Sequence, residues 1–329
     1  MPSPVKSCGP TSIEYFEGKD PAFALGDKSR YAFDYLVDHH DLAGALAGRC
    51  PRLVFNLCDQ GFKNDPRKEL HIPALCEVLG LPYTGAPPAC LVLAFDKTVA
   101  SAVARSVGVA VPRENLLREG TQFATCDVPF PALVKPNFAD GSFGIFHDSV
   151  VRNQTELLSY LQRVGPYNLG PLLLQEYLPG TEYCVVAIGN PRSGDFRVLP
   201  VLEKDYSGFG ADYPPITGFE VKWWAQEQPF AYELDLRAAQ LSTPEREAIE
   251  RDAERLFRRF DCRDYAKFDF RRDAEGLPRL IDVNPNFDLF SDSLAMMAEL
   301  AGSSHAAIID DILDSALRRH TVNGVNQSG

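Results

Sequence analysis

The chain has 329 residues, of which 45% are hydrophobic and 11% aromatic, so it can bury a sizeable core and is not a disordered chain. Its formal net charge of −12 argues against a nucleic-acid-binding protein, because such a protein needs a basic surface. The longest apolar run, residues 89–95, is far shorter than the ~20 residues that span a bilayer, and residues 1–10 lack the hydrophobic core of a signal peptide. We therefore expect a cytoplasmic protein with no membrane or nucleic-acid partner.

The eight cysteines are scattered along the chain, with no Cys-x-x-Cys pair and no histidine at metal-ligand spacing. Neither a zinc site nor a disulfide framework is indicated, and most of the cysteines lie in apolar runs. We expect them to be buried, reduced thiols.

The first part of the chain alternates predicted helices and strands. We expect a helix over residues 29–37, a buried strand over residues 52–57, and a helix over residues 70–79 that ends at Gly80. Strands that alternate with helices are typical of a parallel sheet, so residues 1–95 are predicted to form an α/β domain.

Residues 96–182 are predicted to form a small, strand-rich lobe. The strand over residues 130–136 places Lys135 at its end, and a glycine-containing loop at residues 140–144 follows it. A helix is expected over residues 155–164, before the next strand.

Residues 183–320 are predicted to form the last domain, and residues 321–329 a disordered tail. After a long loop over residues 203–241, Ser242 and Glu245 form a capping-box pattern that begins a helix. Apolar residues at helical spacing give this helix a buried face, made of Ile249, Ala253, Leu256, Phe257 and Phe260. A closing helix is expected to bury Ile308, Ile309, Ile312, Leu313 and Leu317.

Two short strands in this last domain carry oxygen ligands. Because side chains alternate along a strand, Lys267 and Asp269 share one face, and Asp282 and Asn284 share a face of the next strand. With a turn over residues 274–277, Asp269 lies opposite Asp282, with Cβ atoms roughly 5 Å apart. Carboxylates that close repel each other unless a cation lies between them, and hard oxygen ligands favour Mg²⁺. An exposed hairpin with a solvated acidic face is the alternative interpretation.

Lysines and a small-residue loop indicate phosphate binding. Lys135 ends a strand just before the loop at residues 140–144, and Lys97 is a second candidate, since an ammonium is a point charge suited to a phosphate. The loop matches neither P-loop nor GxGxxG spacing, so an ordinary turn stays open. The strand over residues 175–178, followed by Glu182, can serve an adenine and a ribose; a purely structural strand is the alternative.

The order of these features resembles the ATP-grasp pattern, and the chain is identified as a member of the D-alanine–D-alanine ligase family. The matching segments are LPYTGAPPACLVLAFDK (residues 81–97), FPALVKPNFADGSFGI (130–145), LLLQEYLPGTEY (172–183), FEVKWW (219–224), YAKFDFRRDAEGLPRLIDVNPN (265–286) and the segment from Ser291 to Leu294. The resemblance covers roughly residues 52–318. It implies a three-domain ATP-grasp fold, with α+β lobes and an N-terminal parallel-sheet α/β domain.

The resemblance also implies roles for individual residues. The ATP-binding set is Lys97, Lys135, Gly141, Ser142, Glu176, Tyr177, Leu178, Glu182 and Lys222. The metal ligands are Asp269, Asp282 and Asn284, which would hold two Mg²⁺ ions, or Mn²⁺, against the phosphates. Catalytic roles fall to Lys267, Lys222 and Ser142, and substrate contacts to Lys267, Asp288 and Ser293. Lys267 stands where the family usually has an arginine, so the charge is kept and the bidentate fork is lost.

Other segments depart from the family pattern. Residues 1–50 lack a match to the family's glycine-rich strand and its glutamate, and the loop that begins at Cys58 replaces the His-Gly…Glu-Asp-Gly loop. A serine of the family becomes Gly141, a lid tyrosine becomes Trp223, and a glycine becomes Asp288. We therefore expect the ATP-binding half to be intact and the amino-acid half to be rebuilt.

The resemblance implies an ATP-dependent ligase that joins a small-molecule carboxylate to an amine through an acyl-phosphate, with no side-chain nucleophile. The altered loops favour a specialised dipeptide or amino-acid conjugate as the product. A cell-wall D-alanine–D-alanine ligase, a small-molecule kinase and a non-catalytic nucleotide sensor are the alternatives. A homodimer is suggested by the resemblance alone.

Overall fold

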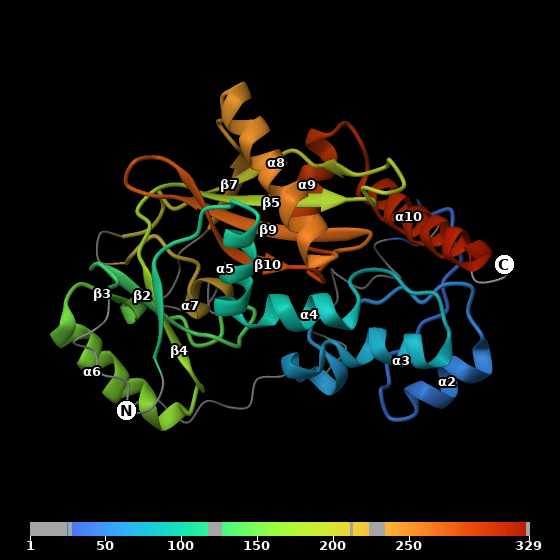
Figure 1. The fold of residues 1–329 in the computed structure, drawn as a ribbon, viewed down its shortest axis with the longest axis horizontal. Coiled ribbons are helices and arrows are strands. Elements are labelled where there is room, and N and C mark those ends of the chain that lie inside the picture. The colour runs from blue at the N-terminus through green and yellow to red at the C-terminus, as the bar shows by residue number, and fades with distance from the viewer. Residues whose placement is uncertain (1–24, 26–27, 118–126, 211–212, 224–233, 327–329) are drawn as a thin grey trace.

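The computed structural model describes residues 25, 28–117, 127–210, 213–223 and 234–326, whose arrangement is shown in Figure 1. Among these residues, two antiparallel sheets form the middle of the molecule, and helices pack on them. This mixture of helices and antiparallel sheets agrees with the α+β lobes that we expected. None of the helices in the described ranges combines the length and the apolar character needed to cross a bilayer.

The smaller sheet has the strand order β1-β4-β2-β3. Its strands are β1 (Glu114–Leu117), β2 (Ala132–Pro136), β3 (Val150–Val151) and β4 (Leu172–Glu176). Helix α6 (Gln154–Val164) begins after Asn153, whose side chain accepts a hydrogen bond from Glu156 N. Its apolar face packs on the sheet through Leu157, Tyr160 and Val164. The strand and helix predicted for this region are confirmed.

The larger sheet has the strand order β10-β9-β5-β7-β8, and β6 also pairs with β5. Its strands are β5 (Glu182–Ile188), β6 (Arg197–Val198), β7 (Leu202–Asp205), β8 (Asp235–Ala238), β9 (Tyr265–Arg272) and β10 (Pro278–Asn284). Every residue of β5 is buried, because helices cover both faces of this part of the sheet.

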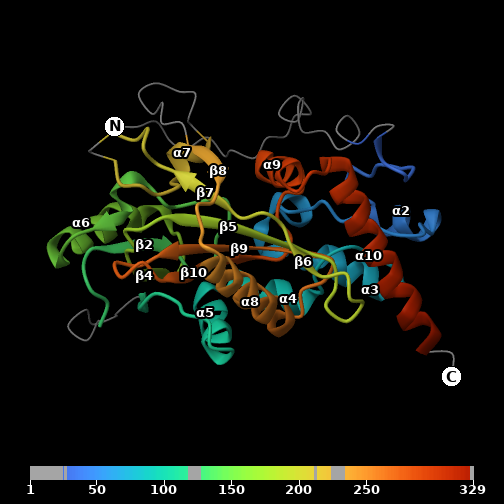
Figure 2. The ribbon, with the colours of Figure 1, turned by 90° about the horizontal axis from the view of Figure 1, so that it is seen from above.

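Different helices cover the two faces of the larger sheet (Figure 2). Helices α4 (Pro88–Phe95), α5 (Lys97–Ser106) and α8 (Thr243–Phe260) share one core with β5, β9 and β10. Helices α9 (Asp292–Leu300) and α10 (His305–Asn326) share the core on the opposite face. The capping box and the buried face of α8 are confirmed. In α10 the expected residues are buried, except that Leu317 is only half-buried.

The N-terminal region differs from the prediction at two places. Residues 29–37, all within the described ranges, contain no helix, and α2 (Leu42–Arg49) comes later. The helix prediction is wrong because Ser29 and Arg30 N instead hydrogen-bond to the Asp310 carboxylate of α10.

The strand predicted over residues 52–57 is reduced to an isolated parallel bridge between Val54 and Tyr83. Beyond that bridge, Asn56 N donates to the Thr84 hydroxyl rather than to a backbone carbonyl. The ladder therefore stops, and the predicted parallel sheet is limited to this bridge within the described ranges. The predicted helix before Gly80 is confirmed as α3 (His71–Leu79), and short 3-10 turns lie at Phe62–Asn64, Pro66–Lys68, His147–Ser149 and Gly165–Tyr167.

Two other predictions need correction. The long loop expected over residues 203–241 contains most of β7, the short helix α7 (Phe219–Trp223) and strand β8, which pairs with β7. The tail expected from residue 321 is helical up to Asn326, because α10 continues through it.

Candidate active site

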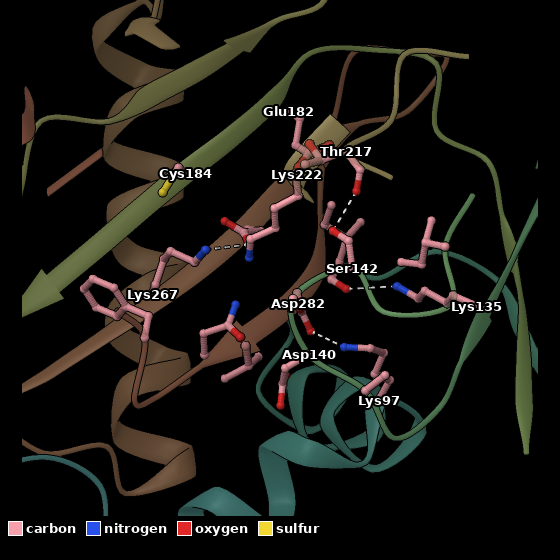
Figure 3. Close-up of a pocket in the computed structure, with 18 of the residues that line it drawn as sticks. Lys97, Lys135, Asp140, Ser142, Glu182, Cys184, Thr217, Lys222, Lys267 and Asp282 are labelled. Atoms are coloured by element: carbon pink, nitrogen blue, oxygen red, sulfur yellow. Dashed lines mark hydrogen bonds and ion pairs between the residues drawn. The ribbon is translucent and has the colours of Figure 1, made fainter. Parts of the chain in front are cut away.

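A cavity of about 520 Å³ is lined by both sheets, by α5 and by the segment that contains α7. All the residues predicted for the site line this cavity, from Lys97 in α5 to Ser293 in α9. Figure 3 shows Lys97, Lys135, Lys222 and Lys267 around one space, with Asp282 among them. The fold therefore brings together residues that are almost 200 positions apart in the sequence.

The hairpin of β9 and β10 places Asp269 opposite Asp282, as the alternation predicted. The two strands are not in one register throughout. From Pro278, opposite Arg272, to Leu280, opposite Phe270, the pairing is regular, and a one-residue shift between Leu280 and Asp282 then brings Asp282 opposite Asp269. Such a shift is typical of a β-bulge, which redirects side chains locally. The bulge is therefore part of what places the two carboxylates together.

Lysines neutralise both carboxylates. Lys97 Nζ lies 2.8 Å from Asp282 Oδ1, and Lys267 Nζ lies 3.3 Å from Asp269 Oδ2. Burial by itself would raise the pKa of Asp282, but Lys97 and Lys135 outweigh burial and lower that pKa. Asp282 is therefore ionised at neutral pH and available to a cation.

The donor set fits a magnesium ion that is held together with a nucleotide. Oδ1 of Asp269 is buried and has no hydrogen-bond partner in the part of the chain that the structure describes. Within the same residues, no group of three His, Cys, Asp or Glu side chains gathers to hold a metal. Mg²⁺ is usually held by one or two carboxylates plus substrate phosphates, so two carboxylates and the Asn284 amide are adequate.

Two of the lysines that line the cavity have lowered pKa values. Burial, together with the nearby Lys97, lowers the pKa of Lys135 to about 8. Burial, together with Lys267, lowers the pKa of Lys222 to about 8. An anion in the cavity would favour the protonated form of both lysines, so the site is suited to a polyphosphate.

The glycine-containing loop contacts the segment that contains α7. Ser142, at a φ of 61°, donates from its hydroxyl to Thr217 O over 2.7 Å. Trp223 Nε1 donates to Gly141 O over 2.9 Å, and Phe219 N donates to Ile145 O over 2.6 Å. The loop and this segment, which we call the lid segment (residues 213–223), are thus fastened together over the cavity that Lys222 lines.

Glu182, predicted to bind a ribose, has several protein partners. It accepts hydrogen bonds from Lys204, from the Tyr206 hydroxyl at 2.9 Å and from Arg271 at 3.2 Å. Burial would raise the pKa of Glu182, but Lys204 and Arg271 outweigh burial and lower it to about 2. Sequence reasoning missed Lys204 and Arg271. The alternation along β9 that groups Lys267 with Asp269 also places Arg271 on that face, and this signal could have found it.

Acidic side chains line the part of the cavity where the sequence departs from the family pattern. Burial and the nearby Asp288 raise the pKa of Asp59 to about 6. Burial, followed by the charge of Asp140, raises the pKa of Glu69 well above its usual value. Asn286 donates to Glu69 over 2.8 Å and holds it in place.

A sequence model of the family described as "D-ala D-ala ligase C-terminus" matches residues 106–314, which is more than half of the chain. The chain belongs to the D-alanine–D-alanine ligase family. It is 32% identical over 278 residues to y4sG, an uncharacterised protein of Sinorhizobium fredii, with 84% of this chain and 78% of that protein covered. It is 25% identical over 312 residues to the D-alanine–D-alanine ligase of Desulfotalea psychrophila, with 92% of this chain and 90% of that enzyme covered.

Solved structures of the D-alanine–D-alanine ligase family share the fold. The crystal structure of D-alanine–D-alanine ligase from Bacillus anthracis, complexed with ATP, matches with a TM-score of 0.66 at 19% identity. The match covers 88% of this chain and 86% of that chain. The predicted ATP-grasp fold is therefore confirmed, and the protein is a member of a ligase family.

Proposed function

We propose that the protein is an ATP-dependent carboxylate–amine ligase, which forms an amide bond through an acyl-phosphate. The observation that carries the proposal is the gathering of Lys97, Lys135, Asp269 and Asp282 in one cavity. The buried Oδ1 of Asp269, without a partner among the described residues, adds a donor that suits a metal-bound nucleotide.

The nucleotide is held by residues of both sheets. In this proposal Lys97 and Lys135 bind the phosphates, and the loop with Gly141 and Ser142 covers them. The base lies against Glu176 to Leu178, and the ribose lies near Glu182. When bound to Asp269, Asp282 and Asn284, two Mg²⁺ ions, or Mn²⁺, supply positive charge that spreads the negative charge of the phosphates.

The reaction has two steps. A donor carboxylate oxygen attacks the γ-phosphorus, the bond to the β–γ bridging oxygen breaks, and ADP leaves. The amine then attacks the acyl carbon, the carbon–oxygen bond to phosphate breaks, and loss of a proton leaves a neutral amide. Lys222 neutralises the transferred phosphoryl group, Lys267 stabilises the oxyanion, and the lid segment excludes water.

We propose that the substrates are a small-molecule carboxylate and an amine, at least one of them an amino acid, in specialised metabolism. Support comes from the carboxyl groups of Asp59, Glu69 and Asp288, which would accept hydrogen bonds from an ammonium group in the cavity. Ser293 and Asp288 are assigned to the acceptor, and Lys267 to the donor carboxylate.

The second candidate is a D-alanine–D-alanine ligase of cell-wall synthesis. It is favoured by relatives of that name, such as the Desulfotalea psychrophila enzyme. Incubation with ATP, Mg²⁺ and mixtures of amino acids, followed by phosphate release and product mass, separates the candidates. A mixed dipeptide or conjugate with free phosphate supports the proposal, and efficient turnover of D-alanine alone supports the second candidate.

The same assay tests the other classes of function. ADP that appears with a phosphorylated product and without free phosphate would identify a kinase. Nucleotide binding without ADP formation under any substrate mixture would identify a sensor. Either result would overturn the proposed ligation.

Several other expectations stay proposals. They are domains at residues 1–95, 96–182 and 183–320, a cytoplasmic location, and a homodimeric assembly. Analytical ultracentrifugation tests the assembly, because a dimer doubles the 36.4 kDa mass of the chain.

A further inference from the structure

A buried arginine with one unused donor lines the nucleoside end of the cavity. Arg271 is 5% exposed, and its Nε has no hydrogen-bond partner among the residues that the structure describes. A guanidinium offers five N–H donors in a rigid fork, and a buried donor that remains unsatisfied costs free energy. A ligand that brings an acceptor to this position would remove that cost.

The rest of the Arg271 side chain is held firmly by the protein. Nη1 donates to Glu182 over 3.2 Å, and Nη2 donates to Pro215 O over 2.7 Å. The guanidinium carbon also lies 5.3 Å from the ring centre of Tyr177 and 5.6 Å from that of Tyr206. These contacts come from separate parts of the fold, so the direction of the Nε–H bond is set before a ligand arrives.

Donors outnumber acceptors around this arginine. Both oxygens of Glu182 already accept hydrogen bonds, from Lys204 on one side and from Tyr206 and Arg271 on the other. The charges of Lys204 and Arg271 exceed the single charge of Glu182. The ligand that completes this end of the cavity must therefore supply acceptor atoms.

We propose that Arg271 is a specificity-determining residue that recognises the nucleoside by donating its Nε–H to an acceptor atom. The acceptor is a ring nitrogen of the purine or an oxygen of the ribose. This inference rests on the proposed function, because it requires the nucleotide to lie in this cavity. Since Nη2 holds the backbone of Pro215 in the lid segment, the same guanidinium links the nucleoside to the lid.

The test compares two neighbouring arginines. Arg271→Lys keeps the positive charge next to Glu182 but removes the fork and its Nε–H. Arg272→Lys is the matched control, because Arg272 lies on the other side of β9 and pairs with Glu245 over 2.6 Å. Calorimetric titration with Mg²⁺ and ATP should give a dissociation constant about tenfold higher for the first variant, as expected for one hydrogen bond to a charged group. The control should stay within about twofold.

Nucleotide analogues identify the acceptor and do not depend on how well the variant folds. The 1-, 3- and 7-deaza analogues each remove one ring nitrogen, and 2′-deoxy- and 3′-deoxy-ATP each remove one hydroxyl. One analogue should bind the wild-type protein about tenfold more weakly than ATP does. The Arg271→Lys variant should bind that analogue and ATP with equal affinity, because it lacks the Nε–H that makes the difference. The inference is overturned if no analogue weakens wild-type binding, or if each weakens the wild type and the variant equally. Failure of the wild type to bind ATP at all would instead overturn the proposed function.

Discussion

Replacement of Asp282 by asparagine should separate the structural role of this carboxylate from its catalytic role. Asp282 pairs with Lys97, whose side chain is only 9% exposed, so the substitution leaves a buried ammonium without its closest charge partner. Removal of one member of a buried ion pair costs about 3–5 kcal/mol. The cost here should be smaller, about 2 kcal/mol, because the Asp282 side chain is 28% exposed and Asp140 also attracts Lys97. For a chain of 329 residues, the unfolding temperature should then fall by about 3 °C.

The same substitution should abolish turnover without abolishing nucleotide binding. Loss of a metal-binding carboxylate removes several kcal/mol of charge stabilisation, so ADP formation should fall roughly 100-fold or more. In the absence of Mg²⁺, the variant should bind ATP at least as tightly as the wild type, because the cavity has become more positive. Calorimetric titration with and without Mg²⁺ measures both affinities.

A second aspartate of the same hairpin supplies the control. Asp273 is buried, accepts from Arg279 Nε over 2.7 Å and from Leu277 N over 2.8 Å, and does not line the cavity. Asp273→Asn should therefore lower the unfolding temperature and leave ADP formation unchanged. If Asp282→Asn forms ADP within about threefold of the wild type, the metal assignment is refuted.

The remaining predictions concern pH and packing. Lys135 and Lys222 each have a pKa of about 8, so both lose their protons as pH rises above 8. The dissociation constant for ATP, measured by calorimetric titration, should therefore rise between about pH 7 and about pH 9. Replacement of both lysines by arginine should remove this rise. Because the folded state raises the pKa of Asp59 from 3.8 to about 6, the contribution of this residue to stability falls as pH rises from about 4 to about 6. Asp59→Asn should therefore be more stable than the wild type by up to about 3 kcal/mol above pH 6 and no different below about pH 4. Equal urea midpoints for the two proteins at both pH values would contradict this. Phe257→Ala should lower the free energy of unfolding in urea by about 3–5 kcal/mol, because this ring is fully buried. Leu277→Ala is the control: this side chain is 60% exposed, so its removal should change stability by less than about 0.5 kcal/mol.

Local patterns in the sequence were sufficient for several elements. The capping box at Ser242 and the apolar spacing that follows it specify the start and the buried face of α8, since both depend on residues within a few turns of each other. The alternation along β9 placed Lys267 and Asp269 on one face for the same reason. The helix predicted over residues 29–37 failed where a distant residue, Asp310, offered the backbone a better partner.

In the site, too, short-range features could be predicted from the sequence and long-range contacts could not. We could predict the kinds of side chain that surround the cavity and their order along the chain, because each lies in a short segment with a recognisable pattern. The pairing of Lys97 with Asp282, 185 positions away, could not, because it depends on how α5 packs against β10.

By itself, the sequence determined the capped, amphipathic helix α8, the faces of strands β9 and β10, and the kinds of charged side chain in the site, because these properties follow from spacing along a short stretch of chain. Only the tertiary structure decided that a bulge would align the two aspartates, and that Lys204 and Arg271 would surround Glu182. These outcomes depend on register and packing between distant segments, where the free energies of many contacts compete and no single stretch of sequence specifies the result.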